Sequence, residues 1–227
     1  MNIILQHYDG KLGELEELSK YNMECYARDV GAEYHLIKGM PFDSSIKSQC
    51  QKVHMIHQDF DSYNEVLMVD IDMFVPKEIS ENVFDWPGIG MYEPIQQGLH
   101  RGMVRSRPGE LDLANIDAPY WGGAIYKMDR ITRQRLRSAL EAVNFQHPGW
   151  RNNHPHVDEG IFHTLAYKAG FKVKEPKMFI DQRWCWCSYL PNPEKALMMH
   201  IRNKSTPQGD RKPKIENYKN LVARGIL

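Results

Sequence analysis

The sequence predicts a doubly wound α/β fold, with a mostly parallel central sheet flanked by helices. Short aliphatic segments alternate with amphipathic ones along the first 70 residues, which is the order of repeated strand-helix units. Residues 66–69 form a continuous apolar run of the kind that is buried on both faces of a parallel sheet. A chain of 227 residues is long enough to bury the core of one such domain.

Two strand-helix units and a third strand are expected before the middle of the chain. Gly31 ends the first helix, and the side-chain oxygens of residues 43–45 can cap the start of the second. The expected strands are residues 2–7, 34–37 and 66–69, and the expected helices are residues 12–30 and 43–64.

The second half is less regular. Residues 98–119 carry glycines, prolines and charges without periodicity, which predicts a long surface loop of the kind that often covers an active site. The other expected elements are strands at residues 89–92, 120–126 and 171–173, helices at 131–143 and 158–169, and a short helix within 211–227.

Bulk composition excludes several classes of protein. The 29 basic residues balance the 29 acidic ones, so no overall field attracts nucleic acid or an anionic membrane. No apolar run approaches the roughly 18 residues of a transmembrane segment, and the N-terminus has too few aliphatic residues for a signal peptide. The cysteines, Cys185 and Cys187 among them, do not have zinc-knuckle or redox spacing. We expect a soluble protein in a reduced, cytoplasmic setting, without a nucleic-acid partner.

Asp70 and Asp72 follow the most apolar strand. Ligands of open parallel sheets bind at the carboxyl ends of the strands. Along an extended chain both carboxylates would face one divalent cation, with Ile71 turned back into the core. A nucleoside diphosphate would supply further oxygens, and the cation would offset the charge of the departing diphosphate. We assign all three residues to a cofactor site.

Two other interpretations of the aspartate pair stay open. Aspartate is a common turn residue, so the pair can simply end the strand. An Asp-x-Asp pair also follows an apolar strand in phosphatases, where the first aspartate is a nucleophile. Phosphatases typically carry this motif on the first strand, with Thr or Val two residues beyond it, whereas Phe74 occupies that position here.

Several blocks of the sequence together resemble the GT-A fold glycosyltransferases. They occur in the family's order, and the resemblance spans about residues 2–207. The blocks are Lys52, residues 63–75 with Asp70-Ile71-Asp72, residues 121–126 with Gly122-Gly123, residues 158–162 with Asp158-Glu159, and residues 199–201 with His200. The chain is most similar in character to small retaining-type families and to short viral or bacterial members without membrane anchors.

The resemblance implies a single GT-A domain over residues 1–227. Residues 1–90 would form the nucleotide-binding half, residues 91–210 the half that binds sugar and acceptor, and residues 211–227 a tail. The implied activity is transfer of a hexose or pentose to a hydroxyl of a glycan or glycoconjugate. The implied donor is a nucleotide diphosphate sugar in which the sugar is linked to UDP. The implied cofactor is Mn²⁺ or Mg²⁺. The alternatives are a phosphatase or nucleotidyltransferase that uses the same pair, or a non-catalytic domain that binds sugar nucleotides or carbohydrate.

By the same resemblance, His200 would be the third metal ligand, because an imidazole with two carboxylates suits Mn²⁺. Lys204 would neutralise the diphosphate, although its register departs from the family's pattern. Asp158 and Glu159 would be the catalytic carboxylates, acting as a base on the acceptor or as stabilisers of the charged sugar. The alternatives are a histidine of the C-terminal strand, a solvated lysine, and carboxylates that cap a helix.

The remaining candidates would line the donor. Tyr8 and Asp9 follow the first strand and would contact the nucleobase and ribose, or form a simple turn. Lys52 would help to hold the donor, or be solvated. Gly122 and Gly123 would let the backbone approach a ligand closely, or mark a bulge. An aromatic cluster could present a platform for an acceptor sugar, or pack a C-terminal lobe; its members are Trp184, Trp186 and Tyr189.

Overall fold

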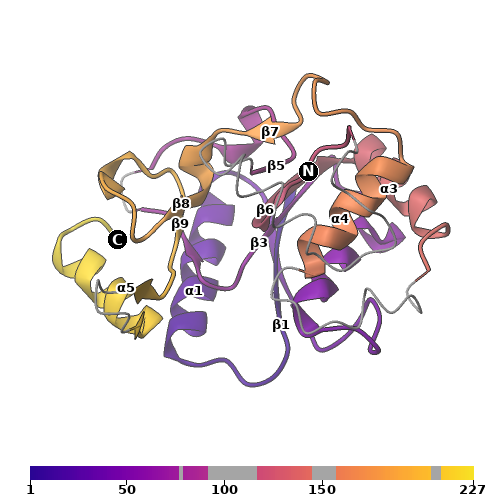
Figure 1. The fold of residues 1–227 in the computed structure, drawn as a ribbon. Coiled ribbons are helices and arrows are strands. Elements are labelled where there is room, and N and C mark those ends of the chain that lie inside the picture. The colour runs from indigo at the N-terminus through magenta and orange to yellow at the C-terminus, as the bar shows by residue number, and fades with distance from the viewer. Residues whose placement is uncertain (77–78, 92–116, 145–156, 206–210) are drawn as a thin grey trace.

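A central six-stranded sheet organises the protein in the computed structural model, which describes residues 1–76, 79–91, 117–144, 157–205 and 211–227 (Figure 1). The strand order is β2-β1-β3-β6-β5-β7. The strands are β1 (Ile3–Tyr8), β2 (Glu33–Lys38), β3 (Glu65–Val69), β5 (Gly90–Met91), β6 (Gly122–Asp129) and β7 (Phe179–Ile180).

The predicted α/β fold with a mostly parallel sheet is confirmed. Strand β1 runs parallel to both β2 and β3, and β5 runs parallel to β7. Strand β6 is antiparallel to its neighbours β3 and β5. Because β1 and β3 are parallel neighbours, their carboxyl ends, Tyr8 and Val69, lie at the same edge of the sheet.

Helices cover both faces of the sheet, which explains the continuous apolar run of β3. Its side chains alternate between two cores: Met68 packs under one face and Leu67 under the other. Helix α1 (Glu14–Asp29) lies on the Leu67 side, and α3 (Arg130–Leu140) and α4 (Val157–Lys168) lie on the Met68 side together with the 3₁₀ helix η1 (Ser48–Ile56) (Figure 1).

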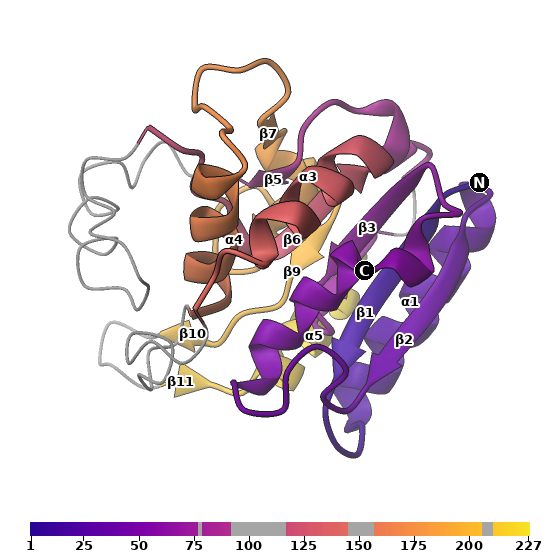
Figure 2. The ribbon, with the colours of Figure 1, turned by 90° about the vertical axis from the view of Figure 1, so that its right-hand side faces the viewer.

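A second, smaller sheet lies beside the first and includes the C-terminal part of the chain. Strand β4 (Met73–Phe74) pairs antiparallel with β9 (Met199–His200), and β8 (Trp186–Cys187) runs parallel to β9. Helix α5 (Lys214–Ala223) packs against α1. Between β9 and α5 in the sequence, β10 (Lys204–Ser205) and β11 (Arg211–Lys212) pair antiparallel (Figure 2).

The helix expected from residues 43–45 is wrong in both type and start. Asp43 does not cap a helix, because its Oδ1 accepts a hydrogen bond from the Ser45 amide at 2.7 Å in a local turn. The buried Gln51 side chain then holds the Phe42 and Asp43 amides and the Asp43 carbonyl. The helical segment begins at Ser48, as η1, and η2 (Gln58–Phe60) follows it.

The strand expected at residues 171–173 is also wrong. Gly170 has φ 76°, and the Phe171 amide reaches back to the Ala166 carbonyl at 2.9 Å, which is a Schellman-type end for α4. Phe171 is apolar because it packs at this helix end against Trp121. The strand that follows α4 in the sheet is β7, which forms the edge next to β5. The expected loop at 98–119 falls largely outside the described residues.

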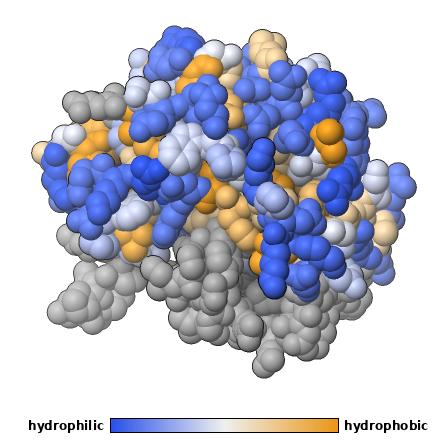
Figure 3. Space-filling view, turned by 90° about the horizontal axis from the view of Figure 1, so that it is seen from above, coloured by the Kyte–Doolittle hydropathy of each residue, from blue (hydrophilic) through white to orange (hydrophobic). Residues whose placement is uncertain are grey.

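The other expected elements are present with small shifts of their ends, including the terminal helix, α5. The face seen in Figure 3 is largely hydrophilic, with apolar residues in small groups. Among the described residues, no helix has the length and apolar character to cross a membrane. No disulfide joins the four cysteines, all of which lie in the described residues: Cys25, Cys50, Cys185 and Cys187.

Candidate functional site

Asp70 and Asp72 lie in a tight turn between β3 and β4. The Met73 amide donates to the Asp70 carbonyl at 3.1 Å, so this segment is not the extended chain that was expected. Ile71 is half-buried at the turn and does not point back into the core. The carboxylates converge because the turn folds them together, which corrects the strand-alternation argument.

Two buried polar side chains fix this turn from behind. The Gln6 Nε2 group donates to the Asp70 carbonyl and to the Ser19 hydroxyl, both at 3.0 Å. Ser19 in turn donates to the Met73 carbonyl at 2.7 Å. The backbone on either side of Asp72 is therefore tied to β1 and to α1, which limits how far its carboxylate can move.

Strand pairing brings His200 to the aspartates across a long sequence separation. His200 pairs with Met73 in the β4–β9 ladder, and the Ile201 amide donates to the Asp72 carbonyl at 2.9 Å. The His200 Nε2 atom lies 3.2 Å from Asp72 Oδ1 and 3.8 Å from Asp70 Oδ2. The three side chains each offer one ligand atom, and these atoms lie within 4.8 Å of one another.

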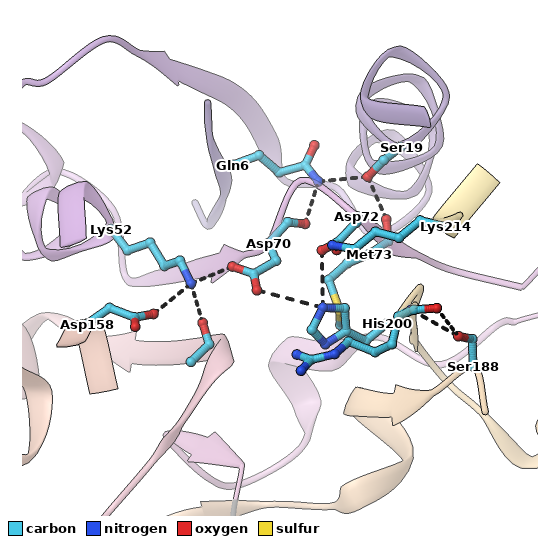
Figure 4. A network of polar contacts seen from close by, with 12 residues as sticks. Gln6, Ser19, Lys52, Asp70, Asp72, Met73, Asp158, Ser188, His200 and Lys214 are labelled. Carbon is cyan, nitrogen blue, oxygen red and sulfur yellow. Dashed lines mark hydrogen bonds and ion pairs between the residues drawn. The ribbon is translucent and has the colours of Figure 1, made fainter. Parts of the chain in front are cut away.

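A lysine binds the second oxygen of each carboxylate (Figure 4). Lys52 Nζ lies 2.5 Å from Asp70 Oδ1, and Lys214 Nζ contacts Asp72 Oδ2. The remaining oxygens, Oδ2 of Asp70 and Oδ1 of Asp72, face the His200 ring. The two lysines therefore orient the carboxylates so that one oxygen of each converges with the imidazole nitrogen.

The chemistry of this triad fits a divalent metal. Burial works against the charge of Asp72, but the His200 ring and the Lys214 ammonium outweigh it and hold the pKa of Asp72 well below its ordinary value. The Asp72 carboxylate is therefore ionised at neutral pH. Two carboxylate oxygens and one imidazole nitrogen form a donor set that suits Mn²⁺, with Mg²⁺ as a substitute.

A second polar cluster adjoins the triad through Lys52. Besides Asp70, the Lys52 ammonium contacts Asp158 Oδ2 at 3.0 Å and the Gly123 carbonyl at 2.6 Å. Lys52 is buried, which rules out the alternative that it is a solvated lysine. Burial opposes its charge, yet the carboxylates of Asp158 and Asp70 raise the pKa of Lys52. Burial also raises the pKa of Asp158, and Lys52 offsets part of that rise.

The glycine pair of β6 is not equivalent at its two positions. A Cβ on Gly123 would lie 2.7 Å from Asp158 Oδ2 and 3.1 Å from Glu159 Cγ. The Gly123 amide donates to Glu159 Oε1 at 3.2 Å, and the Tyr120 hydroxyl donates to Glu159 Oε2. A Cβ on Gly122 would meet the flexible end of Met91 instead. Close approach of the Asp158-Glu159 pair to the backbone thus requires glycine at position 123.

The other predicted site residues have less direct relations to the Asp70, Asp72 and His200 side chains. Tyr8 ends β1 at the same edge of the sheet as the triad, and the exposed Asp9 follows it. Lys204 lies in β10, but its side chain is outside the described residues. Trp184 is fully buried and packs edge-on against Trp86, so it belongs to the core and is not part of a sugar platform.

Sequence reasoning missed Lys214, Gln6 and Ser19. Lys214 lies 142 residues from its partner, in a segment expected to be a tail, and no local pattern identifies it. Gln6 did leave a signal, because it interrupts the aliphatic side chains of β1 and yet is fully buried. A polar residue within a buried strand is expected to have a specific hydrogen-bonding partner.

Comparison with known proteins identifies the fold. Neither protein-family models nor curated protein sequences match this chain. A glycosyltransferase involved in the glycosylation of the major capsid of PBCV-1 is similar over 97% of this chain and 98% of its own, with a TM-score of 0.58 and 13% identity. The galactosyltransferase LgtC, solved with donor and acceptor sugar analogs, is similar over 98% and 96%, with a TM-score of 0.51 and 11% identity. The chain therefore has the GT-A fold that its sequence predicted.

Proposed function

We propose that this protein is a metal-dependent glycosyltransferase, which moves a sugar from a UDP-linked donor to a hydroxyl of a glycan or glycoconjugate. One observation carries the proposal. Asp70 Oδ2, Asp72 Oδ1 and His200 Nε2 converge at the carboxyl edge of the sheet, where ligands of α/β proteins bind. The GT-A fold supports it, because both similar structures belong to glycosyltransferases.

In this proposal Asp70, Asp72 and His200 hold Mn²⁺ or Mg²⁺. The bound metal would supply Lewis-acid stabilisation of the diphosphate leaving group. The chain's own contribution is to keep these ligands ionised and fixed: Lys214 and His200 lower the pKa of Asp72, and Lys52 orients Asp70. A preorganised charged site needs little reorganisation when the charge on the leaving group develops.

The proposed sugar pocket adjoins the metal triad on the side of Asp158. Lys52 bridges Asp70 and Asp158, so a single ammonium sets the spacing between the metal ligands and the second carboxylate pair. Gly123 leaves its backbone open beside Asp158 and Glu159. We assign these two carboxylates to the reacting sugar, as a base toward the acceptor or as stabilisers of positive charge on the sugar ring.

We assign the residues around the rest of the donor from their positions in the fold. Tyr8 and Asp9, at the carboxyl end of β1, would contact the nucleobase and ribose. Gly122 would lie near the sugar, and Lys204 near the diphosphate. The whole chain would act as one domain, in which Lys214 extends the site into the segment expected to be a tail.

Sugar-nucleotide turnover tests the proposal. The full chain is incubated with a panel of UDP-, GDP- and CMP-sugars and Mn²⁺, and release of the free nucleotide is measured. We expect slow hydrolysis of at least one UDP-sugar, its loss with EDTA, and its loss in Asp72→Asn. Absence of hydrolysis with every donor, together with no thermal stabilisation by UDP and Mn²⁺, would contradict the proposal.

The same assays separate the alternatives. Phosphate release from simple phosphomonoesters would identify a phosphatase that uses Asp70 as its nucleophile. The structure disfavours that role, because the Asp70 Oδ1 atom is bound to Lys52 at 2.5 Å and its Oδ2 atom faces His200. Stabilisation by UDP and Mn²⁺ without turnover of any donor would instead identify a binding domain.

A further inference from the structure

A second cluster of metal-binding side chains lies at the junction of η1 and η2. His54 belongs to the last turn of η1, His57 joins the two helices, and Asp59 belongs to η2. Each offers one ligand atom, and the three atoms lie within 4.8 Å of one another. None of these residues belongs to the Asp70 site, so the cluster does not serve the proposed transfer directly.

One pair of side chains in the cluster has the spacing of two ligands of a metal ion, and the third is within 4.8 Å. His57 Nδ1 lies 3.1 Å from Asp59 Oδ2, near the roughly 3.3 Å between two ligands of a tetrahedral Zn²⁺. The His54 and His57 rings stack with their centroids 4.9 Å apart. The side chains of His57 and Asp59 are 44% and 64% exposed, so both can rotate by the small amount that full convergence needs.

His57 Nδ1 also accepts a hydrogen bond from the Asp59 amide at 3.4 Å at the start of η2. A helix cap and a surface ion pair thus account for His57 and Asp59, but not for the second imidazole. His54 is half-buried, stacks on His57 and meets the Phe60 ring edge-on. A second imidazole beside the His57–Asp59 pair is more than an ion pair needs, and imidazole is a common ligand of borderline metals.

A hollow beside the cluster leaves room for further ligands. It has a volume of about 410 Å³ and runs along the edge strand β2. Its walls include His54 and Asp59 from the cluster, and His35, Lys38 and Tyr63 around it. Water or a small anion could therefore complete the coordination of an ion held by three protein ligands.

We propose that His54, His57 and Asp59 form a second metal site, which binds a borderline transition-metal ion of the Zn²⁺ class. Two imidazoles and one carboxylate with an open fourth position match the ligand set of such sites. An ion bound there would tie η1 to η2. That segment leads from Lys52 to β3, so the ion would stabilise the part of the chain that carries the Asp70 site.

Co²⁺ titration in a background without the central triad tests the proposal. Full-length Asp72→Asn protein is titrated with Co²⁺ alone, and the visible absorption and the bound stoichiometry are compared with those of Asp72→Asn/His57→Gln. We expect His57→Gln to remove one Co²⁺ equivalent or to weaken it at least about tenfold. Zn²⁺ should raise the unfolding temperature of Asp72→Asn, and this shift should be absent in the double variant.

Two further variants make the result specific. His35→Gln is the matched control, because His35 is exposed and lines the same hollow without belonging to the triad. Asp59→Asn replaces His57→Gln if that variant does not fold. Identical Co²⁺ titrations with and without His57, or an equal loss in His35→Gln, would overturn the proposal. Both results are independent of whether any sugar nucleotide is turned over.

Discussion

Replacing Lys52 with methionine removes the ammonium that neutralises Asp158 in the buried part of the site. The two side chains are 10% and 7% exposed, with 3.0 Å between Lys52 Nζ and Asp158 Oδ2. Removing one partner of a buried ion pair leaves an uncompensated charge and costs about 3–5 kcal/mol. A typical domain has roughly 5–15 kcal/mol of stability, so the loss should be readily measured by urea unfolding with EDTA present.

The pH dependence identifies the cause of this loss. Burial already raises the pKa of Asp158, with Lys52 as a partial offset, so the native-state pKa must rise further in Lys52→Met. The native variant then binds a proton that the unfolded chain does not, and its stability falls as the pH rises from the ordinary carboxyl range toward the native pKa. We therefore expect the difference in free energy of unfolding between the wild type and Lys52→Met to become smaller as the pH is lowered from about 7 to about 5.

Two controls complete the experiment. The double variant Lys52→Met/Asp158→Asn removes both charges and should recover most of the lost stability, which a double-mutant cycle measures as coupling. Lys20→Met disrupts a partly exposed i,i+4 pair with Glu24 and should cost no more than about 0.5 kcal/mol. A cost in Lys52→Met no larger than in Lys20→Met, or one independent of pH, would refute the reasoning.

Two further predictions concern the neighbouring residues. Gly123→Ala places a Cβ 2.7 Å from the Asp158 carboxylate, so it should cost about 1–3 kcal/mol in urea unfolding and abolish donor hydrolysis. The Cβ of Gly122→Ala meets the flexible end of Met91, so this variant should lose less stability in the same unfolding assay, and equal losses would contradict this difference. Lys214→Gln leaves Asp72 Oδ2 without its ammonium partner, so the carboxylate is less well fixed and Mn²⁺ alone should bind a few-fold more weakly by electron paramagnetic resonance. Unchanged or tighter binding would show that Lys214 does not help to fix this carboxylate.

The sequence predicted the parts of the fold that depend on local patterns. The apolar run of β3 is buried on both faces, as predicted. Because the strand ends where this run ends, Asp70 and Asp72 were correctly predicted to lie just after it. Helix α4 begins beside Asp158 and Glu159 as expected. These features were predictable because apolar periodicity and helix-start signals act over a few residues.

Long-range pairing decided the rest. Asp72 and His200 meet because β4 pairs with β9, and Lys214 reaches the site because α5 packs against α1. No local propensity encodes either contact. The expected strand at Phe171 failed for a related reason, since an apolar residue after a helix can pack at the helix end as well as in a sheet.

The central claim is that Asp70, Asp72 and His200 bind a metal that in turn binds a nucleoside diphosphate. Isothermal titration of UDP into the full-length protein, with Mn²⁺ and then with EDTA, tests it most directly. The account predicts binding that requires Mn²⁺ and is lost in Asp72→Asn, while urea unfolding shows that this variant remains folded. Metal-independent binding of UDP, or wild-type affinity in Asp72→Asn, would contradict it.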